Sequence, residues 1–200
     1  GINRVLVQAF GAASNEVGRT TIDVWYDDGS VVNVGGTLAA DTTWTANAGP
    51  YVITNNLTVP AGRTLTIAAG TTVFLGANVN LTVGIGGRLL AQGSDVAPIR
   101  IGRVPGGGAW GGVMINGGPG SPESVISYAH IEGNNNTAFQ VTHGTAIFDH
   151  LTFGTTTRQY ISVDRSSFVI SDCVFPSATA GFELVHANGG IKAGGRGVIA

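Results

Sequence analysis

Two histidines and an aspartate recur at similar places in three short apolar segments of the second half of the chain. They are His130, His150 and Asp172, and each directly precedes an apolar residue. If these segments are strands, side chains alternate between the two faces, so each polar residue points outward when the next one points inward. Imidazole and carboxylate groups stacked on one face could hold a metal ion or act as an acid–base pair. The simpler interpretation, which we favour, is an exposed polar row that only solubilises this face.

An alignment of the three segments sets the spacing of this row. Taking Ile131, Leu151 and Cys173 as equivalent positions gives separations of 20 and 22 residues. Further acids lie near the same face, among them one that directly precedes a histidine of the row. The predicted ligand-binding residues are His130, His150, Asp172 and Asp149. No catalytic residue, metal or cofactor is predicted.

A repeat in the first half of the chain indicates the architecture that positions these residues. The sequence Asn-Leu-Thr-Val at 56–59 recurs 24 residues later at 80–83, and each copy is followed by a glycine-containing turn and a second short apolar segment. Self-similarity at this period is typical of stacked units that are each too small to bury their own apolar face. Short strands without intervening helices at about this period predict an all-β, right-handed parallel β-helix.

Composition excludes several classes of function. The 200 residues include 32 glycines, 43% hydrophobic residues and only 11% charged residues, which favours a β-rich folded domain over disorder. The net charge is −2 and the arginines are scattered, so nucleic-acid binding is not expected. No apolar stretch approaches the roughly 18 residues of a membrane span. The single cysteine excludes an intrachain disulfide.

Three segments follow from the hydrophobic pattern. Residues 1–29 read as a β-hairpin, 30–50 as a polar connector and cap, and 51–200 as the parallel β-helix. A lone hairpin is marginally stable in water, so we expect this one to pack on the solenoid, on further sequence or on another molecule. Asp27-Asp28-Gly29 offers oxygen ligands for calcium, although a turn is the commoner explanation of such a sequence.

The repeated Asn-Leu-Thr-Val units, together with 61–67, 87–93 and 98–101 ahead of Trp110-Gly111-Gly112-Val113, resemble the right-handed parallel β-helix superfamily of pectate-lyase-like solenoids. The style is similar to β-helix regions of large exported bacterial multidomain proteins, which implies a secreted or cell-surface location. Residues 1–7 and 21–27 resemble the last hairpin of an immunoglobulin-like module in such proteins.

The resemblance also implies a carbohydrate alternative. The superfamily includes pectate lyases and polysaccharide hydrolases, which use clustered acids, with calcium and a basic residue in the lyases or paired carboxylates in the hydrolases. The β-helix segment 51–200 has no paired-aspartate motif, so we do not predict an enzyme. Trp25, Trp44 and Trp110 could form a sugar-binding platform if exposed, but we expect each of them to pack in the core or the cap.

The function expected from these patterns is structural. We expect an extracellular scaffold that associates with itself or with other modules of a larger exported protein, and that forms filaments through the solenoid ends and the hairpin. The alternative is a module that binds or degrades polysaccharide. The residues expected to mediate assembly are Val5, Val7, Ile22, Val24, Trp25 and Ile199.

Overall fold

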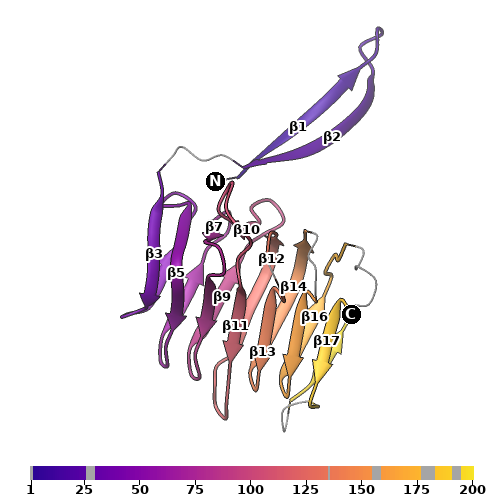
Figure 1. Cartoon of the computed structure of the whole chain (residues 1–200). Helices are drawn as coiled ribbons and strands as arrows, with labels where there is room; N and C mark the ends of the chain where they lie inside the picture. Colours follow the sequence, from indigo (N-terminus) through magenta and orange to yellow (C-terminus); the bar gives the residue numbers. More distant parts are fainter. Residues whose placement is uncertain (1, 26–29, 135, 155–158, 177–182, 191–194) are drawn as a thin grey trace.

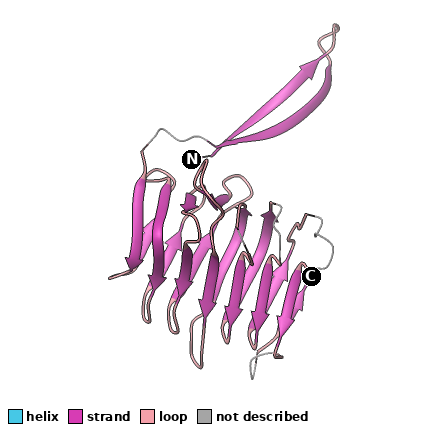
Figure 2. Ribbon diagram, in the orientation of Figure 1, coloured by secondary structure: helices cyan, strands magenta, loops and turns pink. Residues whose placement is uncertain are grey.

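The chain folds into a parallel β-solenoid preceded by an antiparallel hairpin. The computed structural model describes residues 2–25, 30–134, 136–154, 159–176, 183–190 and 195–200. The regular secondary structure within these ranges consists of β-strands alone (Figure 2). The parallel strands stack into about 6 turns (Figure 1). The predicted all-β class, the parallel solenoid and the N-terminal hairpin are therefore confirmed.

Each turn contributes short strands to three stacks, which we call the first, second and third faces. The first face contains the start of β3 (Val32–Thr37) and of β5 (Tyr51–Val59), then β7 (Thr72–Leu75), β10 (Ile99–Arg103) and the ends of β12 (Ser124–Ile131) and β14 (Thr145–Phe153). The second face contains the ends of β3 and β5, then β8 (Asn80–Val83), β11 (Gly112–Asn116), β13 (Phe139–Thr142), β15 (Ile161–Asp164) and β17 (Val185–Asn188). The third face contains β4 (Thr42–Trp44), β6 (Thr64–Ile67), β9 (Arg88–Gln92), the starts of β12 and β14, β16 (Ser167–Ser171) and β18 (Gly197–Ile199).

The 24-residue repeat aligns consecutive turns as the sequence predicts. Leu57 pairs with Leu81 on the second face, and Leu65 pairs with Leu89 on the third. The first asparagine of each repeat also stacks, because the backbone N–H of Asn80 donates to Oδ1 of Asn56 at 2.9 Å. Identical residues in identical positions thus support each other from turn to turn.

The interior of the solenoid is a continuous apolar column. Inward and outward residues alternate along the strands, as in β6 and β8. Trp110 is fully buried, and its Nε1 donates to the backbone oxygen of Glu132 at 2.7 Å. Trp44 is also buried and stacks on Tyr51 with 4.8 Å between ring centroids. These two tryptophans belong to the core, so neither contributes to an exposed sugar-binding platform.

The solenoid begins earlier in the chain than predicted. β3 pairs in parallel with β5, and β4 pairs in parallel with β6, so residues 30–50 contain strands of the first turn. The sequence VNVGGT of β3 lacks the apolar alternation of later turns because this strand lies at the edge of the stack and is mostly exposed. For this reason the hydrophobic pattern of residues 30–50 predicts a connector and not strands of the solenoid.

The hairpin projects away from the solenoid (Figure 1). β1 (Ile2–Phe10) and β2 (Glu16–Trp25) pair in antiparallel register from Ile2 opposite Trp25. An ion pair joins Arg4 of the hairpin to Asp95 of the solenoid, with 3.9 Å between Nη1 and Oδ2. In the described part of the chain, no helix has the length and hydrophobicity needed to cross a membrane.

Candidate functional site

Three residues with left-handed backbone conformation lie one above another at the edge between the third and first faces. The φ angles of Tyr128, His150 and Asp172 are 48°, 51° and 51°. Ser127 pairs with Asp149 in the next turn, which places Tyr128 beside His150. The pairing of β14 with β16 continues this register and brings Asp172 next. We call Tyr128, His150 and Asp172 the edge row.

The left-handed bend places two consecutive side chains outside the core. Phe148 and Leu151 are fully buried, whereas Asp149 and His150 between them are both at least partly exposed. Regular strand alternation would have turned one of the two inward. The bend therefore adds one outward residue per turn and lets the strand continue onto the next face with its apolar residues still directed inward.

The predicted equivalence of Ile131 and Leu151 is wrong. In the pairing of β12 with β14, Leu151 lies beside Ala129, and His130 lies beside Thr152. The alignment slipped by two residues because Ala129 and Ile131 are both buried, so an apolar pattern can match either of them to Leu151. His130 therefore lies next to the edge row rather than within it, while the predicted stacking of His150 and Asp172 is confirmed.

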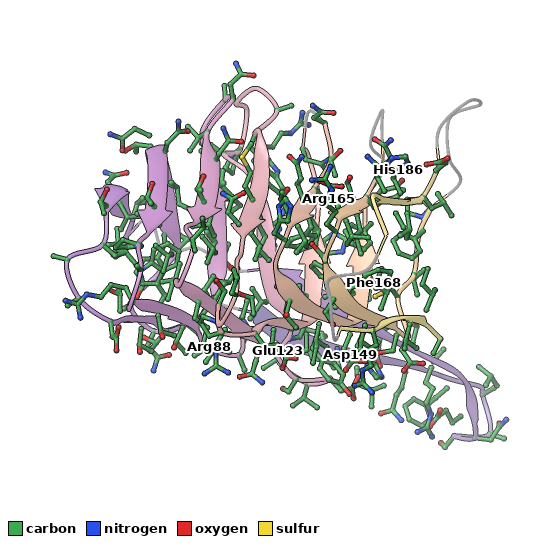
Figure 3. All side chains as sticks on the ribbon, turned by 90° about the horizontal axis from the view of Figure 1, so that it is seen from below. Arg88, Glu123, Asp149, Arg165, Phe168 and His186 are labelled. Atoms are coloured by element: carbon green, nitrogen blue, oxygen red, sulfur yellow. The ribbon has the colours of Figure 1, made fainter. Side chains whose placement is uncertain are left out.

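Asp149, His150 and Asp172 form a compact cluster of charged and imidazole groups. Each offers one ligand atom, and these atoms all lie within 4.8 Å of one another. His150 Nδ1 is 3.0 Å from Asp149 Oδ2. The other carboxylate oxygen of Asp149 accepts a hydrogen bond from Ser171 Oγ at 2.6 Å. Figure 3 shows Asp149 on the outer side of the solenoid, on the same side as Arg88 and Glu123.

Ring stacking restrains His150, and hydrogen bonds stabilise the charged form of Asp149. The His150 ring stacks on Tyr128 with 4.3 Å between centroids and 17° between planes. Burial raises the pKa of Asp149, but hydrogen bonds from Ser171 and His150, together with the charge of His150, outweigh it and leave the pKa below its ordinary value. The carboxylate is therefore ionised at neutral pH.

A groove runs alongside the cluster. It has a volume of about 470 Å³, and its lining includes Tyr128, His130, His150 and Asp172 as well as Arg4 of the hairpin. Because Arg4 lies at this groove, the hairpin forms part of its wall. An open groove of this size bounded by aromatic, imidazole and carboxylate groups can accept a small polar ligand.

His130 is held by a separate network on the first face. Its Nδ1 lies 3.0 Å from Thr152 Oγ1, and its Nε2 lies 3.6 Å from Glu132 Oε2. Arg100 Nε donates to Glu132 Oε1 at 3.0 Å. Burial raises the pKa of Glu132, but the hydrogen bond and charge of Arg100, with a smaller contribution from His130, bring it below its ordinary value.

The structure thus brings together three of the four predicted ligand residues, with His130 at the rim of the same groove. Sequence reasoning missed Tyr128 and Ser171, which orient the cluster. The sequence carries a signal for both residues. Each belongs to a pair of consecutive polar or aromatic residues, Ser127-Tyr128 and Ser171-Asp172, that is flanked by apolar residues on both sides. Asp27 and Asp28, whose sequence is explained more commonly by a turn than by a calcium site, lie outside the described residues.

The chain matches no protein-family model, no curated protein and no solved structure.

Proposed function

We propose that this chain is a structural solenoid module that associates with itself end to end, in a secreted or cell-surface setting. The observation that carries the proposal is the hairpin. Its apolar side chains are 44 to 63% exposed and alternate onto both faces: Val5, Leu6, Val7, Phe10, Val17, Ile22 and Val24. A two-stranded hairpin with two exposed apolar faces is marginally stable alone and gains from burial against a partner. The Trp25 side chain, also predicted to take part in assembly, is outside the described part.

The two ends of the solenoid supply complementary edges. Among the described strands, β4 pairs only with β6, β18 pairs only with β16, and both of these end strands lie on the third face. Each end therefore presents a parallel strand whose outer backbone groups can pair with another chain. A contact between the first turn of one chain and the last turn of another is heterologous, so it repeats without closing and produces a filament.

The test is electron microscopy of the purified chain over a concentration series. We expect fibres whose axial repeat matches the length of one solenoid stack. Ile199→Lys places a charge on the β18 edge and should abolish them, whereas Ile85→Lys should not. Ile85 is the matched control for Ile199, because both side chains are 64% exposed and only Ile199 lies at an end of the stack.

A second variant separates the contribution of the hairpin. Val5 lies opposite Ile22, so Val5→Lys with Ile22→Glu puts opposite charges in that pair and removes two apolar side chains while preserving hairpin pairing. Shorter or fewer fibres in this double variant would support an assembly role for the hairpin. A monodisperse wild-type monomer at every concentration would refute end-to-end assembly.

The alternative is a carbohydrate-binding module, and the groove beside the edge row favours it. The partly exposed Tyr128 offers an aromatic surface there, and His130 and Asp172 offer polar groups. Binding of the monomeric chain to immobilised polysaccharides tests this alternative. Loss of binding in Tyr128→Asn, which tolerates the left-handed backbone, would support it, and no binding by the wild type would exclude it for the polysaccharides tried.

A further inference from the structure

We propose that Asp149, His150 and Asp172 bind a divalent first-row transition metal ion such as zinc. This site is independent of the proposed self-association. Its three ligand atoms lie within 4.8 Å of one another. Bonds of about 2.0–2.1 Å in a tetrahedral zinc site hold ligand atoms roughly 3.3 Å apart, so the three need to close by at most roughly 1.5 Å. A rotation of the exposed side chain of Asp172 covers such a movement.

The backbone already brings these ligands together. Asp149 and His150 are adjacent outward residues at one bend, and Asp172 occupies the same bend one turn further along the stack. The parallel ladder between β14 and β16 fixes the separation of the two turns. Ordering the metal ligands therefore costs little backbone entropy, because the solenoid has ordered that backbone already.

Two neighbouring residues orient the ligands from outside. The Ser171 hydroxyl holds one oxygen of Asp149, which directs the other oxygen toward His150. Tyr128 stacks on the imidazole and restricts its rotation. Hydrogen bonds that hold a ligating carboxylate in this way are typical of protein metal sites.

The donor set selects the class of metal. Calcium takes six to eight oxygen ligands, whereas this cluster offers two carboxylates and one imidazole. An imidazole nitrogen with carboxylate oxygens suits zinc and its first-row neighbours. His130 is not a fourth ligand, because its ring nitrogens lie against Thr152 and Glu132. Three protein ligands beside an open groove leave the remaining coordination position to water.

Isothermal titration calorimetry of the chain without a polyhistidine tag, with zinc chloride as the probe, tests the site. We expect one zinc ion per chain. His150→Asn and Asp172→Asn each remove a ligand and should weaken the affinity at least about tenfold. Asparagine is the substitution of choice because it adopts the left-handed backbone of both positions.

His143→Asn is the matched control. His143 is also an exposed histidine with a left-handed backbone, at φ 53°, but it lies at the edge between the second and third faces. Its substitution should leave zinc affinity unchanged. Ser171→Ala keeps all three ligands and should still weaken binding about tenfold, because the carboxylate loses its orienting hydrogen bond.

Thermal unfolding gives a second readout. Zinc should raise the Tm of the wild type and of His143→Asn, and should raise the Tm of Asp172→Asn less at the same zinc concentration. Circular dichroism verifies that each variant is folded, and if His150→Asn does not fold, Asp172→Asn and Ser171→Ala decide the question. Absence of stoichiometric zinc binding by the wild type would overturn the proposal. Binding that survives in both ligand variants would overturn it too, and would show an adventitious ion only.

Discussion

Phe148→Ala tests how strongly the packing of the core column stabilises the solenoid. Phe148 is fully buried and directly precedes Asp149. In the adjacent turns it lies beside Ile126 and Ile170, which are buried as well. Its ring also contacts Phe139, with 5.1 Å between centroids. The substitution removes a phenyl ring from contacts above, below and across the column.

The expected loss is about 4 kcal/mol in the free energy of unfolding. Replacing a buried phenylalanine by alanine costs about 3–5 kcal/mol, and the cost rises with the cavity that is left unfilled. Here the backbone ladders on both sides keep Ile126 and Ile170 from closing into the space. Because the cavity cannot close, we place the expected loss in the free energy of unfolding above the lower limit of about 3 kcal/mol.

Urea denaturation followed by circular dichroism measures this loss. Phe10→Ala is the control, because Phe10 is 60% exposed on the hairpin and should cost less than about 0.5 kcal/mol. The m-value should stay unchanged, since a changed slope would signal a transition that is no longer two-state. A loss below about 1.5 kcal/mol for Phe148→Ala would refute the argument that the column cannot relax.

Two further substitutions probe the turns beside the groove. The pKa of Glu132 lies below its ordinary value, so the ionised carboxylate stabilises the fold at neutral pH. Glu132→Gln should therefore lower the free energy of unfolding at neutral pH by about 1 kcal/mol or less, because the ion pair with Arg100 is partly exposed. The difference from wild type should shrink as the pH falls through the pKa of Glu132. Urea denaturation at about pH 7 and about pH 3 checks this, and a difference that grows in acid would contradict it. Gly93→Ala would put a Cβ 2.2 Å from the backbone oxygen of Tyr128 and should cost about 1–3 kcal/mol, whereas Gly18→Ala, with no atom near its Cβ, should have little effect in the same measurement.

The repeat made the solenoid predictable from sequence. Leu57 and Leu81 occupy equivalent positions in adjacent turns, and the sequence around them repeats with the same 24-residue period that the structure uses. The strands of the first turn were not predicted from the sequence, and the reason is physical. An edge strand buries less of its surface than a central strand, so β3 carries a weak hydrophobic pattern and has no copy elsewhere in the chain.

The candidate site was only partly predictable. His150 and Asp172 were aligned correctly, because the same apolar pattern and the same left-handed bend occur in both turns. The alignment placed His130 two residues away from its structural equivalent, since Ile131 and Ala129 are both buried and either can be matched to Leu151. Only the hydrogen-bonded register distinguishes the two possibilities.

The left-handed bend brings the residues of the candidate site together. In a regular strand, an outward residue is followed by an inward one, so each turn can contribute only one side chain to a given point on the surface. A left-handed residue at the edge lets one turn contribute two, here Asp149 and His150, and the next turn adds Asp172 at the distance of one strand spacing. A solenoid can therefore collect three ligands from two turns without any loop. Ligand sites in such folds are best sought where left-handed residues stack in register, rather than where single polar residues repeat along a flat face.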